Sequence, residues 1–182
     1  MRLTIRMSLC LLAPPLIAAP AVAQPGTSEV GFDAGGDVTF VGGQEDVDFS
    51  VPTGRIRWGV FFDDANSIEI EVGGAATDVA DDADFVGTAG LGVIHHLSSD
   101  YRYSRPFMGL RGRYSHIDVG DVSAGQFGVG GILGYVLPVS EGAIRLAVAY
   151  THSIGNDDFA EAHTVSGTIG ASVFIGRPRA RR

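Results

Sequence analysis

The stretch that most constrains this chain is 53–74, which reads as a β-hairpin with two chemically opposite faces. Successive side chains of a strand point to opposite sides, and here charged residues alternate with apolar ones. Arg55 and Arg57 in the first half face Glu69 and Glu71 in the second, so opposite charges meet across the two strands. The apolar positions are Ile56, Trp58, Val60 and Phe62, then Ile68, Ile70 and Val72.

Two kinds of barrel accommodate such a ribbon. A soluble barrel buries the apolar face and exposes the charges, whereas a bacterial outer-membrane barrel turns the apolar face to lipid and the polar face to its lumen. If Phe62 lies across from Ile68, a five-residue turn at 63–67 closes the hairpin. Arg57 is then diagonal to Glu71, and we expect the two in one ion-pair network.

The first 23 residues have the pattern of a secretory signal peptide. Arg2 and Arg6 precede an apolar run at 7–19, and the sequence Ala-Val-Ala ends at residue 23. We therefore expect domains at 1–23 (signal peptide), 24–176 (barrel) and 177–182 (basic tail). The single cysteine falls within the signal peptide, so the mature chain has no cysteine for a disulfide or a thiolate metal site.

The composition of the mature chain favours a membrane barrel and argues against nucleic acid as a partner. All 21 acidic residues remain, against 11 of the 13 basic ones, all of them arginine, which gives a formal charge of −10. So acidic a surface repels nucleic acid. No mature segment reaches the roughly 18 consecutive apolar residues of a membrane helix, so strands are the only way for it to cross a bilayer.

Alternating stretches recur eight times, each close to or slightly above the roughly 9–11 residues that a tilted membrane strand requires, and outer-membrane barrels have even strand numbers. They are 29–41, the two halves of the hairpin, 85–96, 105–116, 126–137, 143–152 and 163–175.

The connections between these stretches alternate in character. The four odd ones, expected at 42–50, 75–84, 117–125 and 154–162, hold twelve acidic residues and no arginine. Of the even ones, 63–67 and 138–142 are short and 97–104 is longer. Short turns face the periplasm in bacterial barrels, so we expect the acidic connections to face outside.

The choice between the two barrels follows from the polar face, which is rich in glycine and nearly balanced in charge. Glycine weakens a solvated strand but makes room for long side chains inside a narrow barrel, and enclosed charges must be paired. We therefore expect a charged lumen and a lipid-facing apolar exterior. The expected lumen residues are Asp33, Asp37, Arg55, Arg57, Glu69, Glu71, Arg111, Arg113 and Arg145.

Aromatic residues on the apolar face gather toward strand ends, as in the interfacial girdles of membrane barrels. The alternative is that they are ordinary core aromatics. The expected outer girdle is Phe40, Phe85, Tyr114, Phe127 and Tyr150, and the expected periplasmic girdle is Phe32, Phe62 and Tyr135.

Three strand sequences resemble those of the OmpA-like eight-stranded outer-membrane β-barrel proteins, namely 105–114, 126–135 and 145–150. The resemblance spans the mature chain and implies a fold rather than an activity. Members of the family usually end on an aromatic residue, whereas this chain continues with the basic tail. Without a peptidoglycan-binding domain after the barrel, we expect no wall-tethering role.

Motifs for chemistry are sparse, and we expect no catalytic site, metal site or cofactor. His95 and His96 are adjacent on a strand and point apart, so they cannot share a metal ion. Acids near 78–84 suggest bridging of divalent cations to lipopolysaccharide, but solvated loop charge is the better interpretation. His152, Ser153 and Glu161 faintly resemble the residues of lipid A deacylases, yet His152 and Ser153 also point apart.

Three hypotheses follow. The first is a monomeric integral outer-membrane protein, in contact with outer-membrane lipid and lipopolysaccharide, which supports envelope integrity or binds surface proteins through its acidic loops. The second is a lipid-modifying outer-membrane enzyme, and the third is a soluble periplasmic barrel that binds an apolar ligand.

Overall fold

A computed structural model describes residues 26–41, 47–79, 82–97, 104–119, 122–139, 142–155 and 160–175. At 41, 47–53, 75–79, 82–85, 117–119 and 122 it describes the backbone alone. The described chain forms eight strands: β1 (Ser28–Val41), β2 (Val47–Phe61), β3 (Asn66–Val79), β4 (Asp82–His96), β5 (Arg105–Val119), β6 (Val122–Val139), β7 (Gly142–Ser153) and β8 (Ala162–Ile175).

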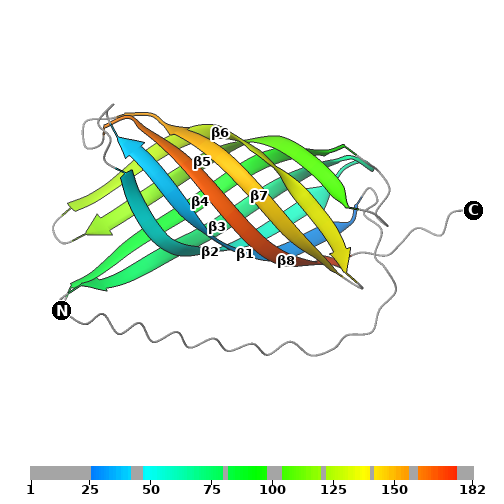
Figure 1. Cartoon of the computed structure of the whole chain (residues 1–182), viewed down its shortest axis with the longest axis horizontal. Coiled ribbons are helices and arrows are strands. Elements are labelled where there is room, and N and C mark those ends of the chain that lie inside the picture. The colour runs from blue at the N-terminus through cyan, green and yellow to red at the C-terminus, as the bar shows by residue number, and fades with distance from the viewer. Residues whose placement is uncertain are drawn as a thin grey trace, which may run out of the picture.

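The strands form a closed antiparallel barrel in sequence order, with each strand hydrogen-bonded to its neighbours along the chain (Figure 1). Closure is made by β1 and β8, which pair from Ser28 opposite Ile175 to Val41 opposite Ala162. The predicted all-β, eight-stranded, up-and-down architecture is therefore confirmed. No helix in the described part of the chain is long and apolar enough to cross a membrane.

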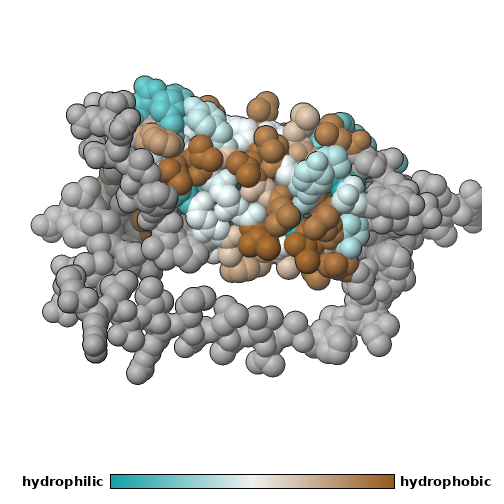
Figure 2. Space-filling model, viewed as in Figure 1, coloured by the Kyte–Doolittle hydropathy of each residue, from teal (hydrophilic) through white to brown (hydrophobic). Residues whose placement is uncertain are grey.

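The barrel is apolar outside and charged inside. Leu110 is 75% exposed and Ile56 63%, whereas Arg57 is only 1% exposed and Glu29 only 2%. Figure 2 shows hydrophobic residues in patches across the middle of the visible face of the barrel, among paler ones. Such a surface matches hydrocarbon rather than water, so the predicted polar lumen and lipid-facing exterior are confirmed. The same polarity excludes the soluble periplasmic barrel.

The strands are longer than the sequence pattern indicates, and three expected loops are wrong in part. Residues 47–50, expected in the first connection, belong to β2 and pair with β1. β3 runs to Val79, which pairs with Asp82 at the start of β4. Likewise Val119 of β5 pairs with Val122 of β6. The ranges 75–84 and 117–125 are therefore mostly strand. A strand that extends beyond the hydrocarbon layer has water on both sides, so its sequence loses the period-two alternation that marks the membrane part.

The hairpin predicted at 53–74 has a tighter turn than expected. Val60, not Phe62, lies across from Ile68. The amide of Phe62 donates to the carbonyl oxygen of Asn66 at 3.1 Å, which leaves three residues in the turn. The Asp63 carboxylate accepts hydrogen bonds from the backbone amides of Ala65 and Asn66, both at 2.7 Å, and this local pairing sets the register.

Seven of the eight aromatic residues assigned to girdles point outward and are 41–56% exposed: Phe32, Phe40, Phe62, Tyr114, Phe127, Tyr135 and Tyr150. The side chain of Phe85 lies outside the described residues. Tyr114 and Phe127 are direct cross-strand partners on β5 and β6. Their division into two interfacial rows stays a prediction.

Candidate functional site: a charged lumen above an apolar plug

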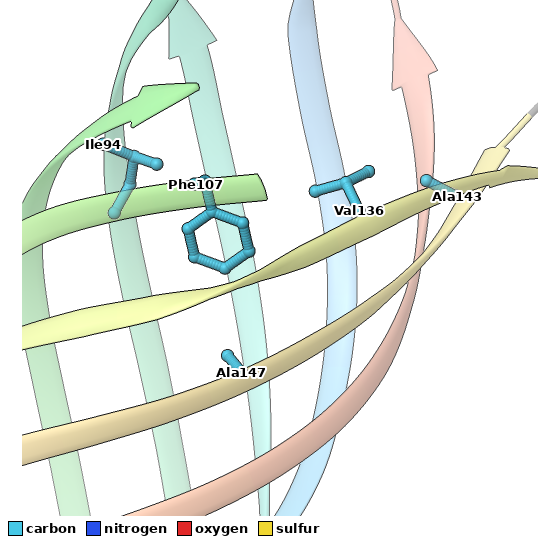
Figure 3. Close-up of a cluster of buried hydrophobic side chains, with 5 residues drawn as sticks. All are labelled: Ile94, Phe107, Val136, Ala143 and Ala147. Atoms are coloured by element: carbon cyan, nitrogen blue, oxygen red, sulfur yellow. The ribbon is translucent and has the colours of Figure 1, made fainter. Parts of the chain in front are cut away.

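One end of the lumen is filled by apolar side chains, at the end where the even connections and both described chain ends lie. Figure 3 shows the cluster, whose side chains come from β4, β5, β6 and β7 and point into the barrel. Phe174 of β8 packs against both this cluster and Phe61. The cluster consists of Ile94, Phe107, Val136, Ala143 and Ala147.

The five-residue cluster, Phe61 and Phe174 together form an apolar plug. Within it, the buried imidazole of His96 packs against the rings of both Phe61 and Phe107. The ring of His96 lies 5.3 Å from that of Phe61 and 6.0 Å from that of Phe107, measured between centroids. His95, the next residue, points outward and contacts the Asn66 side chain at 2.8 Å. The expectation that His95 and His96 face opposite sides is therefore confirmed, and the apolar plug is a feature that sequence reasoning missed.

Arg57 is the centre of the charged layer above the plug. Its Nη1 donates to Glu29 at 2.9 Å and approaches Glu69 at 3.5 Å, while its Nε donates to Asp33 at 3.2 Å. All four side chains are under 10% exposed, so water screens these charges weakly. An arginine can serve three carboxylates because its guanidinium carries five donors in a fixed plane.

Arg145 joins this cluster to the plug. Its Nη1 donates to both carboxylate oxygens of Glu69, at 3.1 and 2.9 Å. The guanidinium carbon also lies 4.3 Å from the centre of the Phe107 ring, a cation–π contact. Glu69 therefore bridges Arg57 and Arg145, and the network ends directly on the aromatic plug.

Toward the other end of the lumen the ion pairs become separate. Arg55 pairs with Asp37 at 3.2 Å, and Arg111 pairs with Glu71 at 3.4 Å. Glu71 lies opposite Arg57 in the sheet register but bonds to Arg111. Arg113 is 8% exposed, and its buried Nε has no hydrogen-bond partner among the described residues. Beside it, a cavity of about 170 Å³ is lined by polar residues that include Asp37, Gln126 and Arg113 itself.

Glycine stands next to every arginine of this layer, which is how a narrow barrel accommodates them. A Cβ on Gly90 would lie 2.7 Å from Cγ of Glu71, and one on Gly31 would lie 2.8 Å from Nη2 of Arg57. The missing side chains therefore provide the space that the charged ones occupy. The cross-strand neighbours are Gly31 beside Arg57, Gly73 beside Arg55, Gly92 and Gly130 beside Arg111, Gly90 and Gly128 beside Arg113, and Gly170 beside Arg145.

The structure thus places all nine residues of the proposed lumen network inside the barrel, eight as buried side chains and Glu71 as a half-buried one. Glu29 and Arg105 were missed, although both are buried charges. Glu29 stands four residues before Asp33 on the same strand, so strict alternation of side chains places both on the inward face. Arg105 donates to the carbonyl oxygen of Asp64 at 3.4 Å, a contact across connections that sequence alone does not reveal.

The residues that resembled a deacylase do not assemble as one site. Ser153 lines the lumen cavity. The side chain of His152, two residues after the outward-facing Tyr150 on the same strand, points to the outside of the barrel. Glu161 Oε1 lies 3.6 Å from His152 Nδ1 and also 3.6 Å from Nε2 of His163. The structure therefore gathers two histidines and a carboxylate on the outer surface, where sequence reasoning expected no metal site.

Eight closed strands, an apolar exterior and a charged interior define a transmembrane β-barrel of the outer-membrane type. No family model matches the chain, and no curated protein matches it in sequence. Solved structures do match the fold. The chain is similar to Neisserial surface protein A (NspA), with a TM-score of 0.64, 15% identity, and coverage of 81% of this chain and 98% of that one.

Two further barrels show the same likeness. The outer membrane protein OprG from Pseudomonas aeruginosa matches with a TM-score of 0.58 and 13% identity, over 85% of this chain and 99% of that one. Ail, the attachment invasion locus protein of Yersinia pestis, matches with a TM-score of 0.54 and 10% identity, over 84% and 100%. At these identities the shared property is the fold, so this chain has the eight-stranded outer-membrane β-barrel fold.

Proposed function

We propose that this protein is a non-conducting outer-membrane barrel that serves envelope integrity or surface contacts rather than solute passage. The observation that carries the proposal is the filling of the lumen. Arg57, Arg145 and their carboxylates occupy its middle, and the Phe61 and Phe107 side chains occupy the end below. An eight-stranded barrel has an interior only wide enough for side chains, so little room remains for a water path.

The ion pairs also favour a rigid lumen. Opening a path through the middle requires Arg57 to leave three carboxylates and Arg145 to leave Glu69 and the Phe107 ring. Each separated buried charge loses its compensation, at about 3–5 kcal/mol for a broken pair. Steady conduction by thermal opening is therefore expected to be rare.

Single-channel recording in planar bilayers tests this proposal. Wild-type protein is expected to give no steady conductance, because the lumen is closed in its lowest-energy state. A Phe61→Ala/Phe107→Ala variant removes the aromatic plug and should show more frequent openings. The lipid-facing Leu110→Ala variant is the control and should behave as wild type. A large, stable wild-type conductance would reopen the case for a transport channel.

The partners we propose lie at the end formed by the odd connections. These expected connections carry twelve acidic residues and no arginine, so they favour cationic protein surfaces over polyanions. A crystal structure of Ail contains the heparin analogue sucrose octasulfate. The acidity of this chain argues against a similar ligand here. An epitope inserted at Asp81 should be accessible on intact cells and one inserted at Asn66 should not, and reversed labelling would overturn the orientation.

The enzymatic alternative has weaker support, because His152 and Ser153 lie on opposite sides of the barrel wall. Mass spectrometry of lipid A from cells with and without the gene distinguishes the two proposals. Unchanged lipid A is the expected result, and loss of a specific acyl or headgroup modification in the deleted strain would favour the enzyme.

A further inference from the structure

Two histidines and a glutamate converge on the outer surface of the barrel, near the end formed by the odd connections. His152 near the end of β7 and His163 near the start of β8 are direct cross-strand partners. Glu161 lies immediately before β8. The neighbouring Thr151 and Ala162 are buried, so strand alternation directs the three side chains outward. They are 36–60% exposed, so all three are accessible from outside the barrel.

The three groups approach one another without bonding directly. Glu161 Oε1 lies 3.6 Å from both His152 Nδ1 and His163 Nε2, which is longer than a hydrogen bond. One ligand atom from each of the three residues lies within 4.8 Å of the other two. Ligand atoms about 2.0–2.1 Å from a tetrahedral metal ion stand about 3.3–3.4 Å apart. The two 3.6 Å contacts of Glu161 are already near that spacing, and rotation of the exposed histidine side chains draws the two imidazoles together around the ion.

We propose that His152, Glu161 and His163 form a binding site for a divalent transition-metal ion such as Zn²⁺. Two imidazoles with one carboxylate are a donor set that suits zinc, copper or nickel, whereas Ca²⁺ and Mg²⁺ prefer oxygen ligands alone. Three protein ligands leave a fourth position of a tetrahedral ion open to solvent or to a further donor.

Tyr150 gives independent support, because it holds one of the ligands in place. Its hydroxyl lies 2.7 Å from Nδ1 of His163, and the two rings stack with centroids 6.0 Å apart. When a metal ion occupies Nε2, Nδ1 keeps its proton and donates it to this hydroxyl. Metal-bound histidines almost always donate their second ring N–H in this way, which fixes both the tautomer and the ring orientation.

Titration of the tag-free full chain in detergent micelles tests the site, with Co²⁺ absorption as the probe and Zn²⁺ as the competitor. We expect one ion per barrel and a Co²⁺ spectrum with bands of a tetrahedral, histidine-ligated ion. His163→Gln and Glu161→Gln should each weaken binding at least tenfold. Tyr150→Phe should weaken it about 10–100-fold through the lost orienting hydrogen bond. His95→Gln, at the opposite end of the barrel, should change nothing.

Heat-dependent gel mobility confirms that each variant is folded before its titration is interpreted. If His163→Gln fails to fold, the Glu161→Gln and Tyr150→Phe pair still decides the question. Binding that persists in a His152→Gln/His163→Gln variant would overturn the site. Equal displacement of Co²⁺ by Mg²⁺ or Ca²⁺ would also overturn it, because the ligands would then be carboxylates of the acidic connections.

Discussion

The charged layer predicts strong energetic coupling between Arg57 and Glu29. Arg57→Met removes the cation from three carboxylates, while Glu29→Gln removes one carboxylate at similar volume and leaves Arg57 with Asp33 and Glu69. Removing one partner of a buried pair costs about 3–5 kcal/mol, so Arg57→Met should fall in that range. Glu29→Gln should cost less, because its arginine keeps other partners.

The coupling itself follows from the contact geometry. The 2.9 Å contact between Arg57 and Glu29 sets charge centres about 4 Å apart, worth about 4 kcal/mol at an effective dielectric constant near 20. Relaxation of the remaining charges reduces this, so we expect the double variant to be about 2 kcal/mol more stable than additivity predicts. Arg57→Met with Glu71→Gln is the control. Glu71 bonds to Arg111, so its coupling to Arg57 should stay below about 1 kcal/mol.

Reversible urea unfolding of the barrel in phospholipid vesicles measures all of these free energies. The fluorescence of Trp58, the only tryptophan in the chain, reports insertion because its side chain is 49% exposed on the outer face. Additive losses for Arg57 and Glu29 would refute the ion-pair reasoning. Coupling of Glu71 to Arg57 as strong as that of Glu29 would show that the lumen charges act as one undivided network.

The other predictions concern the exterior, the glycines and the turn. Trp58→Arg should reduce the free energy of unfolding by about 2–4 kcal/mol if the site is near the bilayer midplane, and unchanged stability would mean that the side chain does not face lipid. Gly90→Ala should destabilise the barrel in urea titration because its Cβ would displace the Glu71 carboxylate, while Gly167→Ala, with nothing within 4 Å of its Cβ, should not; equal effects would refute the space argument. Hydrogen bonds from the Asn66 side chain, then from the Ala65 amide, lower the pKa of Asp63 in the folded protein. The ionised Asp63 carboxylate therefore stabilises the fold fully above its unfolded-state pKa, and this contribution is lost as the pH falls through the lowered folded-state pKa. The urea midpoint of Asp63→Ala should accordingly approach that of wild type on acidification, and a constant gap would contradict the shift.

The sequence by itself determined the strand number, the faces and the inverted polarity. Each membrane-crossing strand has lipid on one side and a crowded lumen on the other. Apolar residues must therefore alternate with polar or small ones, and this alternation can be recognised in the sequence. The glycines and the balanced charges identified the inner face for the same reason, since enclosed charges need both partners and space.

The alternating pattern ends before β3 does, and 75–84 therefore read as a loop although 75–79 and 82–84 are paired strand. Only the tertiary structure decided the register. The Asp63 turn shifts Ile68 from Phe62 to Val60, and closure around the barrel gives Glu71 to Arg111 rather than to Arg57. It also places His152 beside His163. A pairing between strands depends on turn geometry and on closure of the whole barrel, which no local run of residues encodes.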